Sequence, residues 1–163
     1  KTPEVICMQR SSIPIFFVFL ALCLGAGFIG SYATASSVST WYATLAKPAW
    51  TPPGWLFGPM WTLLYILMAW SAYRVWKTGV SPASRIFLPF WIQLGLNFAW
   101  SWIFFYFRLP GWALVDLVLL LGVLLWNLAV FLSRDLPAGL MLVPYLLWGS
   151  FAGTLNFAIW KMM

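Results

Sequence analysis

Histidine is absent from this chain and acids and cysteines are scarce: its 163 residues include no His, three Asp or Glu, and two Cys. Without histidine, a His-based nucleophile and a His-ligated haem are excluded, and no CxxC pair or acidic cluster offers a metal site. Cys7 lies in the polar N-terminal tail and Cys23 in the first apolar segment, so we expect two free thiols. We therefore expect no metal site and no required cofactor.

Charged residues are also few, at 7% of the chain, whereas 63% of the residues are hydrophobic. This composition leaves too little polar surface to coat a soluble domain of this size. The formal net charge of +6 does not indicate a nucleic-acid surface, because the nine basic residues are scattered and form no run or patch. The composition therefore predicts an integral membrane protein.

Apolar residues fall into five segments separated by Gly, Pro and Ser. A spanning helix needs about 20 apolar residues, and lipid satisfies no free backbone groups, so helices are expected throughout. The first segment is longer than the apolar part of a signal peptide and no clear cleavage site follows, so we interpret it as a resident helix. We predict an all-α integral membrane protein, with one domain over residues 1–163. It is a five-transmembrane-helix bundle with a long structured loop between helices 1 and 2, and its helices cover residues 13–35, 55–76, 85–107, 112–132 and 137–161.

The basic residues also predict an orientation. Six lie on the side of the N-terminus and three on the other side. By the positive-inside rule, the N-terminus is cytoplasmic and the long loop faces out. The first group is Lys1, Arg10, Arg74, Lys77, Arg85 and Arg134, and the second is Lys47, Arg108 and Lys161.

Aromatic residues are the abundant class, with 13 Trp and 14 Phe, more than two interfacial belts require. In the third predicted helix, Gln93, Asn97 and Ser101 recur every four residues, with Trp100 and Phe104 on the same face. This face points inward. It serves either interhelical hydrogen bonds, worth roughly 0.6 kcal/mol each, or a ligand, and both roles are compatible.

Two other helices repeat this pattern. The second carries Trp61, Tyr65 and Met68 at helical spacing, and the fifth carries another such set after Pro144, which can kink a helix. Core packing explains each aromatic residue taken alone, but three inward aromatic faces together predict a pocket. The set on the fifth helix is Tyr145, Trp148, Ala152 and Asn156.

The stretch KPAWTPPGWLFGPMW, residues 47–61, places four prolines and three tryptophans where the loop enters the second helix. Pro48, Pro52 and Pro53 fix φ and favour extended neighbours, which holds Trp50 and Trp55 at the bilayer surface. We interpret the stretch as a preformed lid.

Asp116 is the one acid inside a predicted span. Near the start of a helix, a carboxylate is stabilised by the helix dipole and by a cation such as Arg108. We therefore favour a structural role for Asp116 over a role in a proton relay.

The stretch WYATLAKPAWTPPGWLFGPMWTLLY, residues 41–65, closely resembles the TspO/MBR family of translocator proteins, or peripheral benzodiazepine receptors. QLGLNFAWSWIFF, GWALVDLVLL and PYLLWGSFAGTLNFAIW resemble later family segments in the same order. The resemblance implies a five-helix bundle, commonly a homodimer, in a bacterial cell membrane or, in a eukaryote, the mitochondrial outer membrane.

The resemblance also implies a receptor-like or transporter-like protein that binds porphyrins, such as protoporphyrin IX and haem-type tetrapyrroles, and isoquinoline- or benzodiazepine-type ligands. Its cavity lies under the loop between helices 1 and 2. The implied ligand-binding positions are Tyr42, Trp50, Pro52, Trp55 and Trp61; Asn97, Trp100 and Phe104; and Trp148, Ala152 and Leu155.

Two alternative functions remain open. The resemblance implies that Trp61 and Trp148 are the catalytic pair if the protein degrades protoporphyrin IX in light. A sterol-binding or regulatory scaffold is the other alternative, with small-residue faces at Gly95, Ala99, Gly149 and Gly153 for a dimer. The family's sterol motif would fall on Leu155, Phe157 and Lys161, where phenylalanine replaces the tyrosine, so tetrapyrrole binding is the preferred reading.

Overall fold

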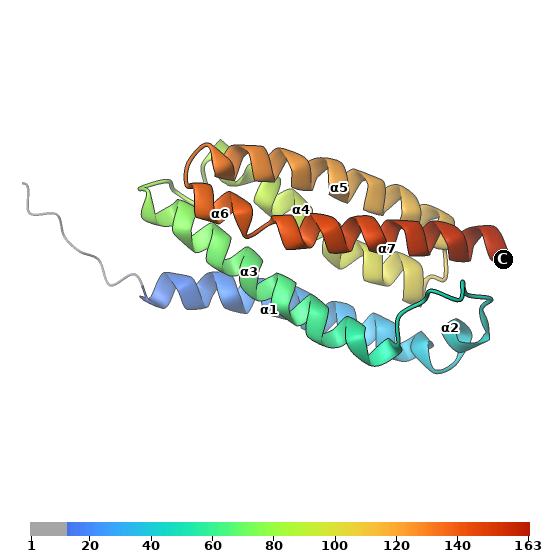
Figure 1. Cartoon of the computed structure of the whole chain (residues 1–163). Helices are drawn as coiled ribbons and strands as arrows, with labels where there is room; N and C mark the ends of the chain where they lie inside the picture. Colours follow the sequence, from blue (N-terminus) through green and yellow to red (C-terminus); the bar gives the residue numbers. More distant parts are fainter. Residues whose placement is uncertain (1–12) are drawn as a thin grey trace, which may run out of the picture.

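The computed structural model describes residues 13–163 as a bundle of long helices, with Ile13 and Met163 at opposite ends (Figure 1). Lys1, Cys7 and Arg10, which enter the charge and cysteine arguments, lie outside the described residues. Five helical segments are long and apolar enough to cross a membrane, which confirms the predicted all-α membrane fold. They are Ile13–Val38, Gly54–Lys77, Arg85–Tyr106, Pro110–Leu132 and Leu136–Met162.

Several of these segments are composite. The second joins a 3₁₀ turn, η1 (Gly54–Leu56), to α3 (Phe57–Lys77). The fourth, by contrast, is the single helix α5 (Pro110–Leu132). The third comprises a 3₁₀ turn, η2 (Arg85–Phe87), then α4 (Leu88–Ser101) and a π-helical turn, η3 (Trp102–Tyr106). In η3, the N–H of Phe107 donates to the carbonyl of Trp102 at 2.9 Å. Such π-turns often occur at functional sites.

The first helix and the loop after it are more helical than predicted. Helix α1 (Ile13–Val38) continues three residues beyond position 35, and the loop contains the short helix α2 (Trp41–Thr44). The ammonium of Lys47 donates to the carbonyls of Tyr42 at 2.6 Å and Leu45 at 3.0 Å, which satisfies backbone groups at the end of α2. The loop is therefore structured as predicted, although partly helical.

The prediction of one continuous fifth helix over residues 137–161 is wrong. It is divided into α6 (Leu136–Leu140) and α7 (Val143–Met162). Pro144 has no N–H to give to the carbonyl of Leu140, so the regular ladder cannot continue through this point. Instead, the N–H of Leu142 donates to the carbonyl of Gly139 at 2.9 Å, and α7 starts afresh with proline in its first turn.

An ion pair ties α6 to α3. The guanidinium of Arg74 lies 2.8 Å from the carboxylate of Asp135, the one ion pair within residues 13–163. Asp135 also accepts the N–H of Ala138 at 2.7 Å and thereby caps α6. The hydrogen bond from Arg74 holds the pKa of Asp135 below its usual value. This partly buried pair joins α3 to α6 at one end of the bundle.

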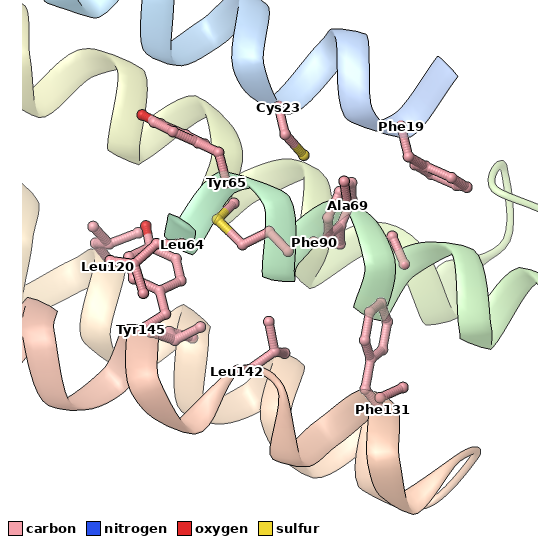
Figure 2. Close-up of a cluster of buried hydrophobic side chains, with 14 of the residues drawn as sticks. Phe19, Cys23, Leu64, Tyr65, Ala69, Phe90, Leu120, Phe131, Leu142 and Tyr145 are labelled. Carbon is pink, nitrogen blue, oxygen red and sulfur yellow. The ribbon is translucent and has the colours of Figure 1, made fainter. Parts of the chain in front are cut away.

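The hydrophobic core fills the end of the bundle that bears α6. Figure 2 shows buried side chains from α1, α3, α4, α5 and α7 meeting there, including Phe19, Cys23, Phe90 and Phe131. Cys23 is buried and free, as predicted. A side-chain carbon on Gly149 would meet Leu121 at 3.1 Å, so this glycine serves α5–α7 packing inside the chain rather than an open dimer face.

Asp116 differs from its expected environment. Its side chain is buried and Oδ2 has no hydrogen-bond partner among the described residues. It forms no ion pair with Arg108, because Arg108 is exposed in the turn before α5, where it adopts the left-handed conformation with φ of 58°. The expected stabilisation of Asp116 by Arg108 is therefore wrong.

Candidate functional site

A cavity of about 770 Å³ lies inside the end of the bundle that bears α2. Helices α1, α3 and α7 and the α4–η3 segment form its sides, and residues of α2 and the following loop close one end. Outside α1, its lining residues are Tyr42, Lys47, Thr51, Pro52, Gly54, Phe57, Gly58, Trp61, Thr62, Tyr65, Asn97, Trp100, Ser101, Phe104, Phe105, Ala152, Leu155, Asn156 and Ile159. Its volume lies in the range of about 300–1,000 Å³ typical of small-molecule sites.

Asn97 links three helices at the inner end of the cavity. Its Oδ1 accepts the hydroxyl proton of Tyr65 on α3, and its Nδ2 donates to the hydroxyl oxygen of Tyr145 on α7. All three side chains are buried. Asn97 therefore forms the expected interhelical hydrogen bonds and also lines the cavity.

A second polar link crosses from α4 to α7. The indole Nε1 of Trp100 donates to Oδ1 of Asn156 at 3.2 Å, and Nδ2 of Asn156 donates to the carbonyl of Pro110 at 2.8 Å. Because these bonds fix the indole, the face of Trp100 is held in a defined orientation beside Phe104, whose ring centroid is 5.3 Å away. The α4 wall is therefore an ordered aromatic surface.

Trp61 is the centre of the aromatic group. Its ring centroid lies 6.2 Å from that of Tyr65, 6.4 Å from Trp100 and 6.1 Å from Tyr145. Rings at these separations gain quadrupolar attraction as well as burial. The group gives the cavity a preformed surface on which a flat ligand can stack.

The loop contributes an aromatic ring and a cation. The ring of Tyr42 packs against Phe105 at 5.5 Å, and partial burial raises the pKa of its hydroxyl. Lys47 lies 4.7 Å from the centroid of the Tyr42 ring. Of the described residues that line the cavity, Lys47 is the one with a charge. An anionic group of a ligand could pair with it.

Three of the implied ligand-binding residues do not line the cavity. Trp55 is 73% exposed, and Trp50 is half exposed and packs on Phe151 at 5.8 Å. Trp148 packs against the lining residue Phe57, with ring centroids 5.7 Å apart, and its buried indole N–H has no acceptor among the described residues. The lining residues among those implied are Tyr42, Pro52, Trp61, Asn97, Trp100, Phe104, Ala152 and Leu155.

The sequence-based set of ligand-binding residues contains none from α1, although α1 forms one wall of the cavity. A side-chain carbon on Gly27 would overlap the ring of Tyr65, so α1 and α3 touch there, and Gly30 is close to Ser101 of α4. The small residues Gly27, Ser31, Thr34 and Ala35 recur at helical spacing, and this pattern is the sequence feature that could have indicated an inward face of α1. The full α1 wall is Leu24, Gly27, Phe28, Ser31, Thr34, Ala35 and Val38.

The residues of the degenerate sterol motif do not share one surface. Leu155 is buried and lines the cavity, whereas Phe157 is exposed, because residues two apart on a helix point about 200° apart. Lys161 is exposed, with its ammonium 5.8 Å from the centroid of the Trp160 ring. Leu155 can contact a ligand in the cavity, but Phe157 and Lys161 cannot do so from these positions.

Comparison with known proteins supports the sequence resemblance. Residues 19–161 match the model of the TspO/MBR family. The chain is 49% identical to the tryptophan-rich protein TspO of Archaeoglobus fulgidus over 85% of this chain and 90% of that protein. It is 43% identical to the tryptophan-rich protein TspO of Chlorobaculum tepidum, over 88% and 92%. It is 39% identical to the translocator protein of Homo sapiens, over 91% and 89%. The chain therefore belongs to the TspO/MBR family of membrane proteins.

Proposed function

We propose that this protein is a receptor-like or transporter-like membrane protein that binds flat aromatic molecules in the cavity, above all porphyrins such as protoporphyrin IX. The observation that carries this proposal is the cavity of about 770 Å³ lined by the rings of Tyr42, Trp61, Trp100 and Phe104. Large apolar pockets with a few polar groups are typical of ligand sites. Benzodiazepine- and isoquinoline-type compounds are likewise aromatic and largely apolar.

The position of Lys47 favours an acidic porphyrin as the ligand over a neutral flat molecule. Its ammonium is held at the cavity by the carbonyls of Tyr42 and Leu45, so it is positioned before a ligand arrives. The propionate groups of a porphyrin supply the carboxylate that this cation can bind, and charge-assisted hydrogen bonds are the stronger kind. With no histidine in the chain, a bound tetrapyrrole is held by stacking and by these polar contacts.

A titration in darkness tests the proposal. Protoporphyrin IX is added to the protein in lipid nanodiscs, and Trp fluorescence is recorded against nanodiscs without protein. We expect saturable quenching with one porphyrin per chain, because Trp61 and Trp100 line the site. Quenching that rises linearly with porphyrin, as partitioning into lipid produces, would show that no such site exists.

Ala152→Phe should weaken this binding by about 1–3 kcal/mol, the usual cost of overfilling a packed site. Ala152 is buried and lines the cavity, so its added ring occupies the ligand's space. Ser150→Phe on the same helix is the matched control, since Ser150 is exposed and does not line the cavity. Affinities are compared by the same titration. Equal affinities in the two variants, with both folded, would place the ligand elsewhere.

Light-dependent degradation of protoporphyrin IX is a second candidate function. The observation that favours it is the position of Trp61 at the cavity wall, in contact with the rings of Tyr65, Tyr145 and Trp100. An indole in that position is the group that an excited porphyrin would meet. This function depends on the binding proposed above.

A further inference from the structure

The exposed residues of the cavity wall lie on one side of the bundle. On α1, Phe28, Ser31, Ala35 and Val38 both line the cavity and are exposed. On α3 and the turn η1 before it, the exposed lining residues are Gly54, Gly58 and Thr62. None of the lining residues of α4, η3 and α7 is exposed, and most of them, including Asn97, Phe104 and Leu155, are buried. The cavity is therefore closed toward α4 and α7 and uncovered toward α1 and α3.

The packing of α3 shows which gap is uncovered. The α3 residues Phe57 and Trp61 face α7, where their rings contact Trp148 and Tyr145. The other lining face of α3 runs from Gly58 through Thr62 to Tyr65, at spacings of four and three residues, and Tyr65 meets Gly27 of α1. Gly58 and Thr62 thus lie on the α1 side, beyond the point where the two helices touch. Helices α1 and α3 can be followed side by side in Figure 1.

The edges of this gap suit lipid rather than water. The hydroxyl of Ser31 donates to the carbonyl of Phe28 at 2.6 Å, and the hydroxyl of Thr62 donates to the carbonyl of Gly58 at 2.9 Å. Both hydroxyls are therefore satisfied by their own helix, and the remaining edge is apolar. Phe28 to Val38 extends about 15 Å along α1, within a helix long and apolar enough to span the bilayer.

We propose that the cavity opens sideways into the hydrocarbon layer between α1 and α3, and that ligands dissolved in the membrane enter through this gap. We call it the side opening and define it by Phe28, Ser31, Ala35, Val38, Gly58 and Thr62. The identity of the ligand rests on the proposed function, but the opening itself does not. The alkyl chain of a membrane lipid reaches Trp61 by the same route when no other ligand is bound.

Gly58→Leu tests the side opening kinetically. A side-chain carbon on Gly58 would meet nothing within 4 Å, so the helix accepts the leucine while its side chain obstructs the gap. Protoporphyrin IX is loaded into protein-free liposomes, and its transfer to reconstituted protein is followed by the rate of Trp quenching. We expect the association and dissociation rates to fall about tenfold together. Gly122→Leu on α5 is the control, because Gly122 also has open space and does not line the cavity.

A bromolipid measurement needs no porphyrin. Quenching of Trp61 by lipids brominated in the acyl chain is obtained as the difference between the protein and its Trp61→Phe variant. We expect strong quenching that is lost in Gly58→Leu and kept in Gly122→Leu. Equal quenching of Trp61 in Gly58→Leu and the unaltered protein would overturn the side opening, as would unchanged transfer rates. If protoporphyrin IX fails to bind the unaltered protein, the proposed function falls and the bromolipid result alone decides on the opening.

Discussion

Asn97→Leu is expected to lower the free energy of unfolding by about 2 kcal/mol, because one amide satisfies two buried hydroxyls. Asn97 accepts the proton of Tyr65 and donates to Tyr145, and the rings of both tyrosines are buried. Leucine has nearly the same bulk but no polar atoms, so both hydroxyls lose a partner in an apolar interior. A single interhelical hydrogen bond in a membrane averages roughly 0.6 kcal/mol, so two orphaned hydroxyls should exceed it.

Gln93→Leu is the matched control, four residues earlier on the same face of α4. Gln93 is fully buried, and neither its Oε1 nor its Nε2 has a partner among the described residues. Removing these atoms relieves a desolvation cost, so we expect unchanged or raised stability. Unfolding in mixed micelles, followed by circular dichroism, compares the two variants. Equal destabilisation by both would mean that volume, and not the hydrogen bonds of Asn97, decides the effect.

Trp61→Phe is expected to slow light-dependent loss of bound protoporphyrin IX by about tenfold or more, if the protein degrades it. Trp61 lines the cavity, and phenylalanine keeps an aromatic surface there but is much harder to oxidise than indole. Trp148→Phe should have a far smaller effect, because Trp148 does not line the cavity and packs against Phe57, which does. The structure thus separates two tryptophans that the family resemblance treats as a pair.

Absorbance of the bound porphyrin under constant illumination measures this loss, after the dark affinity of each variant has been found close to that of the unaltered protein. Heat-denatured protein gives the background bleaching. Equal rates for Trp61→Phe and the unaltered protein would remove the photochemical function. Equal slowing by the two variants would show that Phe57 moves when the ligand binds and exposes Trp148.

The fold could be predicted because a polar or charged residue in a membrane span is costly. The lengths of the apolar segments, and the Gly, Pro and Ser residues between them, therefore mark where each helix begins and ends. The same cost made the α4 face readable: Asn97 and Ser101 stand out against apolar neighbours, and both line the cavity. Helix α1 offers no such contrast. Its cavity face consists largely of small residues, which serve helix packing equally well.

Two details depend on tertiary structure and could not be read from spacing. Phe57 and Trp148 are both aromatic residues on helices that border the cavity, and only the relative rotation of α3 and α7 decides that Phe57 lines it. The break between α6 and α7 precedes Pro144 and is accompanied by the Arg74–Asp135 pair, whose partners are 61 positions apart. A proline in a span indicates a kink, but its neighbours decide whether the helix bends or divides.

The central claim is that a porphyrin binds inside the cavity, and anomalous diffraction tests it most directly. Crystals of the protein are grown with zinc-substituted protoporphyrin IX, whose metal gives a signal that no atom of the chain can mimic. The account predicts one zinc peak per chain inside the cavity, between Trp61, Trp100 and Ala152. A peak on the exposed aromatic surface of Trp112 and Trp160, with none in the cavity, would contradict it.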